Sequence, residues 1–159
     1  MGASWLHIFA RMYKDQFEGF FAWGQNPACS SPGAGKVREA LGKLKWMVNV
    51  NLFDNETASF WKGPGMKPKE IRTEVFLLPC CSSVEKEGSL SNSSRLAQWR
   101  YKAIEPLGQS MPDAEILNEL HFRVKSLYLK GGGKFAEPIV NLTWDYGEKD
   151  ATGKVKHLD

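Results

Sequence analysis

The chemistry that this sequence can offer begins at Gly24-Gln25-Asn26-Pro27, directly after the apolar run 20–23. Gln25 and Asn26 carry side-chain amides, and Gly24 lets a backbone come close to a ligand. Pro27 stops an extended segment from continuing. Polar groups just beyond the carboxyl end of a strand are where open α/β sheets bind nucleotides. The stretch is therefore typical either of a nucleotide-binding loop or of an ordinary connection from a strand to a helix.

Two further polar stretches can act with the first. The apolar run 46–53 has Asn51 near its end and leads into 54–59 (DNETAS), and 85–95 (EKEGSLSNSSR) lies further along the chain. If 46–52 is a strand parallel to the one before Gly24, residues 54–59 open on the same sheet edge as residues 24–27. By pattern alone, these polar loops predict binding of a nucleotide-like ligand.

No arrangement typical of catalysis or of metal binding occurs in the sequence. His7, His121 and His157 are too scattered to serve one nucleophile or one metal ion. The three cysteines, one alone and two adjacent, provide neither a disulfide framework nor a four-cysteine metal site. We expect them to be small buried residues, and we assign no catalytic and no metal-binding residue.

The glycine-rich stretch 32–36 (PGAGK) matches neither of the common phosphate-binding patterns. A Walker loop needs Gly where Ser30 stands and Ser or Thr where Val37 stands. A dinucleotide fingerprint needs Gly where Arg38 stands. The glycines still free backbone N–H groups at the start of a helix, which would suit a pyrophosphate without either motif.

The spacing of apolar residues predicts the elements that position these loops. We expect helices over 4–16 (with Ser4 as the cap), 36–44 and 112–129, strands over 17–23, 46–52 and 73–78, and an extended segment over 96–104. A strand, loop, helix and strand in this order form a crossover unit, which makes the sheet parallel. The predicted fold is α/β: a single domain with a Rossmann-like parallel sheet flanked by helices on both faces.

Composition narrows the class of protein. The chain has 159 residues, and its 21 basic and 18 acidic residues are mixed along it, with a formal net charge of +3. This balance argues against nucleic acid as a partner. No apolar run is long enough to insert into a membrane. We expect the domain to occupy residues 1–147 as a fragment of a longer chain, with a solvated tail over 148–159.

The three polar segments, in this order, resemble a known family. Residues 20–27 (FFAWGQNP), 51–61 (NLFDNETASFW) and 85–95 look like three consecutive cofactor segments of the catalytic (alpha) subunits of molybdenum- or tungsten-dependent formate dehydrogenases. These subunits are molybdopterin oxidoreductases. The helix before the first segment and residues 141–147 (NLTWDYG) fit as well, so the resemblance extends to about Gly147.

The resemblance implies an internal cofactor-binding domain that holds the guanosine diphosphate arm of one of two molybdopterin guanine dinucleotides. The turn at Gly24 and the following helix start would face the pyrophosphate, and Asn51 with the loop after it would meet the guanine and ribose. Residues of the third segment would face the phosphates or the pterin. The cofactor-binding residues implied are Gly24, Gln25, Asn26, Pro27, Asn51, Phe53, Asn55, Glu56, Thr57, Glu87, Ser89, Asn92 and Arg95. Asn51 stands where many family members have Asp, so it brings no charge to the guanine.

The same resemblance implies what the rest of the enzyme contributes. Formate dehydrogenases of this kind work in the periplasm or the cytoplasm, and their 4Fe-4S cluster and active-site Cys or selenocysteine lie upstream of these segments. The fragment should therefore be inactive alone, with the remaining domains of the catalytic subunit and an iron–sulfur electron-transfer subunit as partners. Two alternatives stay open: another molybdopterin enzyme such as a nitrate or polysulfide reductase, and a non-catalytic interaction module.

Overall fold

The computed structural model describes residues 4–92, 95–143 and 148–151. The chain divides into two compact units, Met1–Cys80 and Cys81–Asp159. Much of the expected tail and the end of the segment 141–147 lie outside the described residues. The domain bounds expected from the sequence therefore stay a prediction.

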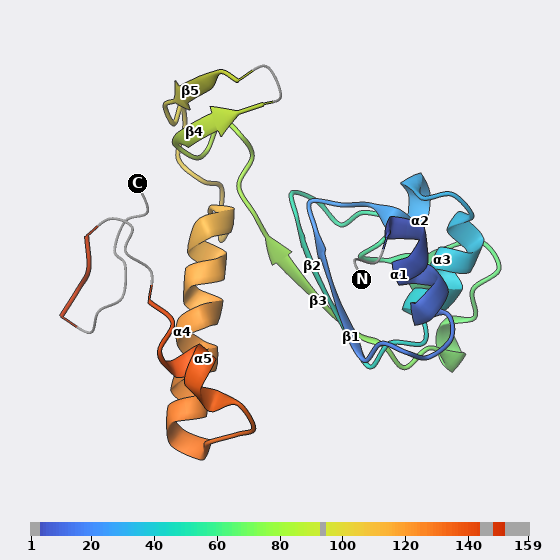
Figure 1. The fold of residues 1–159 in the computed structure, drawn as a ribbon. Coiled ribbons are helices and arrows are strands. Elements are labelled where there is room, and N and C mark those ends of the chain that lie inside the picture. Colours follow the sequence, from blue (N-terminus) through green and yellow to red (C-terminus); the bar gives the residue numbers. More distant parts are fainter. Residues whose placement is uncertain (1–3, 93–94, 144–147, 152–159) are drawn as a thin grey trace. The chain divides into compact units, whose positions relative to one another are not determined.

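The first unit is built on a parallel sheet of three strands (Figure 1). The strands are β1 (Gly19–Trp23), β2 (Trp46–Asn51) and β3 (Glu74–Pro79), in the spatial order β1-β2-β3. Ala22 pairs with Asn49, and Asn49 with Leu77, so all three strands end at the same edge. The α/β class and the parallel sheet expected from the sequence are confirmed.

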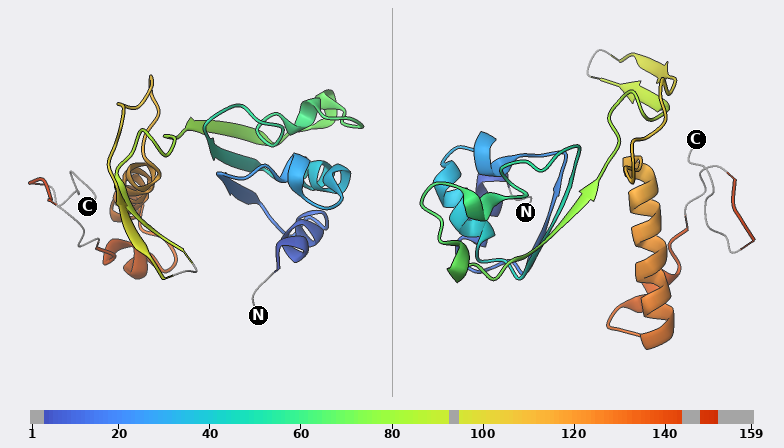
Figure 2. Two further views of the ribbon diagram at one scale, coloured as in Figure 1. Left: turned by 90° about the horizontal axis from the view of Figure 1, so that it is seen from above. Right: turned by 180° about the vertical axis from the view of Figure 1, so that it is seen from behind.

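The helices of the first unit lie on one side of this sheet (Figures 1 and 2). They are α1 (Trp5–Met12), α2 (Pro27–Ser30) and α3 (Ala34–Leu41), followed by two 3-10 turns, η1 (Phe60–Lys62) and η2 (Pro68–Glu70). Ser4 caps α1 as predicted, because its side chain accepts a hydrogen bond from the His7 N–H. The core between these helices and the sheet contains Phe9, Met12, Val37, Leu41, Met47 and Phe60.

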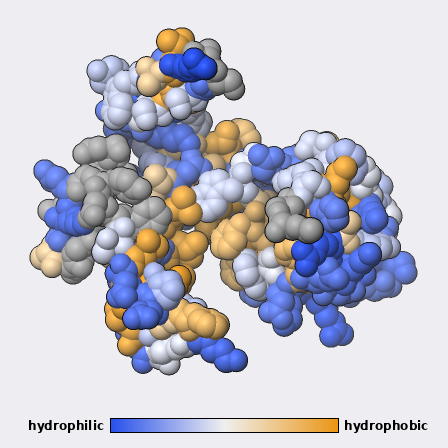
Figure 3. Space-filling view, viewed as in Figure 1, coloured by the Kyte–Doolittle hydropathy of each residue, from blue (hydrophilic) through white to orange (hydrophobic). Residues whose placement is uncertain are grey.

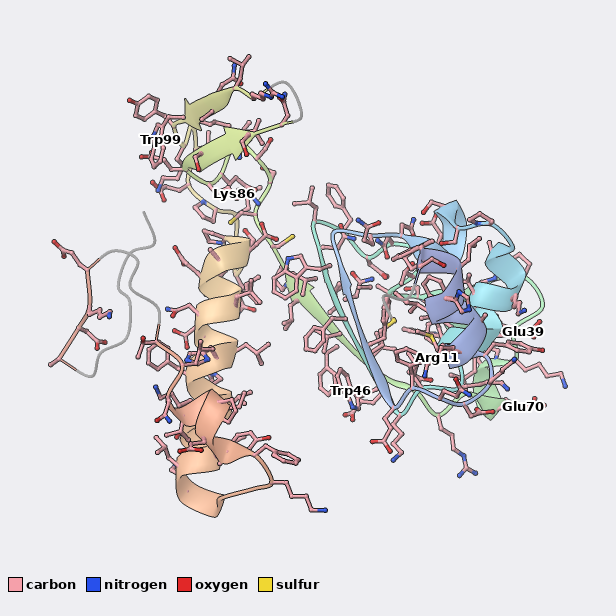
Figure 4. All side chains as sticks on the ribbon, viewed as in Figure 1. Arg11, Glu39, Trp46, Glu70, Lys86 and Trp99 are labelled. Atoms are coloured by element: carbon pink, nitrogen blue, oxygen red, sulfur yellow. The ribbon has the colours of Figure 1, made fainter. Side chains whose placement is uncertain are left out.

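The opposite face of the sheet is apolar, and several of its side chains are partly exposed. The strand register places Phe21, Val48 and Phe76 in one row and Trp23, Val50 and Leu78 in the next. Phe21, Trp46, Phe76 and Leu78 keep 37–46% of their surface exposed. Figure 3 shows apolar side chains on this side of the unit, and Figure 4 shows Trp46 there, away from the helices. Within the first unit, the helices therefore cover one face of the sheet.

The second unit contains a hairpin and two helices. Strands β4 (Gly88–Ser91) and β5 (Ala97–Arg100) pair in the antiparallel direction. Helix α4 (Asp113–Gly131) begins after Pro112, as the sequence predicts, and ends where Gly132 takes a φ of 63°. Helix α5 (Ala136–Val140) was not predicted. In the described part of the chain, none of the helices combines the length and the apolar character needed to cross a membrane.

Candidate functional site

The candidate site lies at the carboxyl edge of the first unit's sheet. Residues 24–27 follow β1, and residues 51–58 comprise the last residue of β2 and the loop after it. We call these two segments the rim. Gly24 continues the sheet by one bond, because its N–H donates to the Val50 carbonyl at 2.9 Å. It then turns the chain with a φ of 61°, a conformation that glycine adopts without steric cost. The sequence-based expectation that both loops open on one edge is confirmed.

Asn26 joins the two halves of the rim. Its Oδ1 accepts hydrogen bonds from the Thr57 N–H at 3.1 Å and the Thr57 hydroxyl at 2.9 Å. Its Nδ2 donates to Glu56 Oε2 at 2.5 Å. Thr57 is fully buried, and its Oγ1 also accepts from the Ala28 N–H at 3.0 Å. Asn26 and Thr57 therefore fix the first loop to the second.

Asn55 makes a second set of links. Its Oδ1 accepts from the N–H groups of Thr57 and Ala58, at 3.1 and 3.0 Å, which closes the turn at residues 55–58. Its Nδ2 donates to the Gln25 carbonyl at 3.4 Å, and Asn51 Nδ2 reaches the same carbonyl at 3.4 Å. The Gln25 carbonyl is thus held from the second loop by two side-chain amides.

The backbone N–H groups of the rim are only partly used. Pro27 has no N–H, and the Ala28 N–H is bonded to Thr57, so the start of α2 does not offer its first donors to a ligand. The expectation that the start of the predicted helix, now α3, faces a pyrophosphate stays a prediction. Among the residues that the structure describes, the N–H groups of Gln25 and Asn26 have no protein acceptor. The turn therefore has two adjacent N–H groups that could donate hydrogen bonds to a ligand.

Several other groups of the rim are exposed. Gln25 is exposed, and Phe53 keeps 77% of its surface in solvent. Asn51 is half-buried, and its Oδ1 accepts from the N–H of the next residue at 2.9 Å. Asn51 is therefore already engaged as a cap on its own turn, which leaves one amide proton and the second lone pair of Oδ1 for a ligand.

Charges of both signs lie next to the rim. The hydrogen bond from Asn26 holds the pKa of Glu56 below its usual range, so Glu56 is ionised at neutral pH. Asp54 accepts a hydrogen bond from Ser59 at 2.6 Å and lies 4.0 Å from Lys62. These groups, with Arg38, line a cavity of about 600 Å³ that opens beside the second loop. A ligand bound at the rim would therefore lie near both acidic and basic side chains of the first unit.

The third polar segment belongs to the second unit. Glu87 accepts a hydrogen bond from the Lys102 N–H at 3.3 Å, and Ser89 lies opposite Trp99 in the hairpin. Figure 4 shows Lys86 and Trp99 at this hairpin. Arg95 is exposed with a φ of 65°, and its N–H donates to the Asn92 carbonyl. Of the expected cofactor residues, the structure brings together the nine of the rim and describes these four separately.

Sequence reasoning missed one residue of the site, Asn49. It is fully buried in β2, and its Nδ2 donates to Asn55 Oδ1 at 3.2 Å. The available signal was a polar residue inside the apolar run Trp46-Met-Val-Asn-Val. The expectation for the cysteines holds for Cys80 and Cys81, which are buried, whereas Cys29 is exposed.

No family model matches this chain. A comparison with curated proteins finds the formate dehydrogenase subunit alpha of Megalodesulfovibrio gigas, 56% identical over 147 residues. The chain is homologous to one segment of the formate dehydrogenase alpha subunits. The match covers 92% of this chain and 14% of that protein. The major subunit of the nitrate-inducible formate dehydrogenase of Escherichia coli K12 is 37% identical over 145 residues, with 89% of this chain and 14% of that protein covered.

A solved structure shows the same fold at lower identity. Acetylene hydratase from Pelobacter acetylenicus superimposes with a TM-score of 0.60 and 17% identity, over 86% of this chain and 18% of that protein. This likeness confirms the fold class. The chain spans about one seventh (14%) of the length of the formate dehydrogenase subunits that it matches.

Proposed function

We propose that this chain forms part of the site for the guanosine diphosphate arm of a molybdopterin guanine dinucleotide in a molybdenum- or tungsten-dependent formate dehydrogenase. The observation that carries the proposal is the joining of two polar loops at the carboxyl edge of a parallel sheet, through Asn26, Asn55 and Thr57. Nucleotides bind at this edge in open α/β folds. The homology to formate dehydrogenase alpha subunits favours formate, rather than nitrate or polysulfide, as the substrate of the whole enzyme.

The turn at Gly24 suits a pyrophosphate. The adjacent N–H groups of Gln25 and Asn26 have no acceptor among the described residues, and phosphate oxygens are strong acceptors for such donors. A Cβ built on Gly24 would meet no atom within 4 Å, so this side of the turn is open for a ligand to approach the backbone. We assign the Gln25 and Asn26 N–H groups to the pyrophosphate oxygens.

The second loop suits the guanosine. The ionised Glu56 carboxylate is an acceptor for ribose hydroxyls, and the exposed ring of Phe53 is a stacking surface for a base. Asn51 can donate its remaining amide proton or accept from the guanine edge with the free lone pair of Oδ1. Because Asn51 is uncharged, it favours guanine less strongly than an aspartate would.

In the full enzyme, the cofactor bound partly by these residues would supply the metal centre for the interconversion of formate and carbon dioxide, and an iron–sulfur centre would accept the electrons. The residues of this chain bind and orient the nucleotide end of that cofactor. We infer that the isolated chain is inactive, and that its partners are the other domains of the catalytic subunit and an iron–sulfur subunit. The residues of the hairpin, Glu87, Ser89, Asn92 and Arg95, remain proposed cofactor contacts.

Calorimetric titration of the chain with GDP tests this proposal, with ADP as the control nucleotide. Only part of the cofactor is present in GDP, so we expect weak binding, with a Kd on the order of 1 mM. ADP should bind several-fold more weakly. Absence of heat with GDP at about 10 mM would count against the proposal.

A pair of variants assigns the binding to the rim. Gly24→Ala and Gly65→Ala each place a Cβ on a glycine of positive φ, 61° and 80°, with no atom within 4 Å. Both should cost roughly 1–2 kcal/mol of stability through backbone strain. Only Gly24→Ala places the new methyl group where the ligand approaches, so only this variant should abolish the heat of GDP binding. Equal losses of binding in both variants would contradict the assignment.

A further inference from the structure

Asn49 is a buried polar residue in the core of the first unit. It has no exposed surface, and its neighbours in the sheet register are Ala22 and Leu77. Two residues earlier on the same face of β2, Met47 packs in the apolar core. An amide in such surroundings is costly unless its donors and acceptors are paired. Asn49 meets this condition only in part.

The two ends of the Asn49 amide differ. Nδ2 donates to Asn55 Oδ1 at 3.2 Å, whereas Oδ1 is buried with no hydrogen-bond partner among the described residues. A valine at this position would fill the core without burying an unpaired oxygen. The hydrogen bond from Nδ2 to Asn55 therefore explains the presence of an amide here better than the stability of the core does.

Asn55 is the residue through which both loops of the rim are held. Its Oδ1 gathers three donors: Asn49 Nδ2 and the N–H groups of Thr57 and Ala58. This fixes which end of the Asn55 amide is oxygen, so that Nδ2 is turned to the Gln25 carbonyl at 3.4 Å. The peptide that carries this carbonyl also carries the Asn26 N–H, one of the two donors assigned to the pyrophosphate.

We propose that Asn49 is a positioning residue for the nucleotide site. It touches no ligand, and acts by fixing the orientation of Asn55, which in turn holds the turn at residues 55–58 and the Gln25–Asn26 peptide. The nucleotide half of this inference rests on the proposed function. The hold of Asn49 on the two loops is a property of the chain itself and can be measured without a ligand.

The test is Asn49→Val in the 159-residue chain, with Met47→Leu as the matched control on the same strand and face. Backbone amide exchange is measured by NMR without nucleotide, the Tm is measured by calorimetry, and GDP affinity is measured by titration. In Asn49→Val, we expect exchange at Thr57 and Ala58 to become about three- to tenfold faster and the Kd for GDP to rise by a similar factor. The Tm should stay equal or rise, because the unpaired oxygen is removed. Met47→Leu should leave exchange and affinity unchanged.

A merely structural role of Asn49 would not give faster exchange at Thr57 and Ala58 together with an equal or higher Tm. Unchanged exchange at Thr57 and Ala58 in a folded Asn49→Val chain would overturn the proposal. So would a uniform loss of protection throughout the first unit together with a lower Tm. If valine is too large for the site, Asn49→Ala removes the amide without overpacking. Its cavity lowers the Tm, so for this variant the test is whether exchange at Thr57 and Ala58 rises more than exchange in the rest of the first unit. Failure of the unmodified chain to bind GDP would refute the proposed function and the nucleotide half of the inference, while the exchange result would still decide the hold on the loops.

Discussion

At the scale of single residues, Thr57 shows how one hydroxyl group joins two loops. Its Oγ1 donates to Asn26 Oδ1 and accepts from the Ala28 N–H, and its own N–H reaches both Asn26 and Asn55. Sequence reasoning placed Thr57 among the ligand contacts. The structure buries it completely, so its contribution to the site is to hold the loops together.

Replacing Thr57 with valine should therefore lower stability. Valine keeps the shape of the side chain but leaves the buried Ala28 N–H and one acceptor site of Asn26 unpaired, at a cost of about 1–3 kcal/mol. Urea denaturation measures the change in the free energy of unfolding. Thr57→Ser retains the hydroxyl and should recover most of the loss. Destabilisation by serine as large as that by valine would contradict this role of the hydroxyl, because serine keeps the hydroxyl and valine does not.

The Asn26–Glu56 hydrogen bond predicts a dependence of stability on pH. This bond lowers the pKa of Glu56 in the folded chain below its ordinary value of 4.5. Its contribution is therefore fully present above that value and is lost as the pH falls through the lower, folded-state pKa. We expect Asn26→Ala to be less stable than the unmodified chain at pH 7, with a gap that narrows towards pH 3. A gap of constant size, measured by urea denaturation across this range, would show that Glu56 takes no part in it.

At the scale of elements, the pairing of β1 with β2 begins with a glycine opposite a tryptophan. The indole of Trp46 lies over Gly19, its partner in the strand register, and packs edge-to-face on Phe21 with ring centroids 5.5 Å apart. A Cβ on Gly19 would lie 2.0 Å from a ring atom of Trp46. The absence of a side chain at Gly19 thus makes room for the indole on the open face of the sheet.

Gly19→Ala should force the Trp46 ring to move and cost about 1–3 kcal/mol. The same substitution in a Trp46→Leu background should cost much less, because the flexible leucine can turn aside. A double-mutant cycle of unfolding free energies measures this coupling. Additive effects of the two substitutions would contradict the contact.

The elements that were predicted are those with a strong local pattern. Apolar runs gave β1, β2 and β3 their places, and helical spacing located α1, α3 and α4 within a few residues. Helices α2 and α5 have only four and five residues, too few for the periodicity of a helix to show in the sequence. Their formation depends on tertiary contacts such as the Thr57–Ala28 bond.

At the scale of the whole molecule, the sequence predicted that three polar segments act together, and the structure divides them between two units. Residues 24–27 and 51–58 share the first unit because parallel pairing of β1 and β2 brings their ends together. Residues 85–95 lie in the second unit, beyond the division after Cys80. The residue types along the chain show which segments are polar, but tertiary contacts decide which of these segments lie in one unit. The role of Asn49 escaped prediction for the same reason, since its partner Asn55 lies on a loop.

The central claim is that the rim binds the pyrophosphate of a nucleotide through the N–H groups of Gln25 and Asn26. Titration of the ¹⁵N-labelled chain with GDP, followed by NMR, tests it most directly because every amide is observed separately. We predict that the Gln25 and Asn26 amide protons shift downfield in a saturable manner, and that the amides of α1 and η2 stay in place. Absence of a response at Gln25 and Asn26, or equal shifts throughout the chain, would contradict this account.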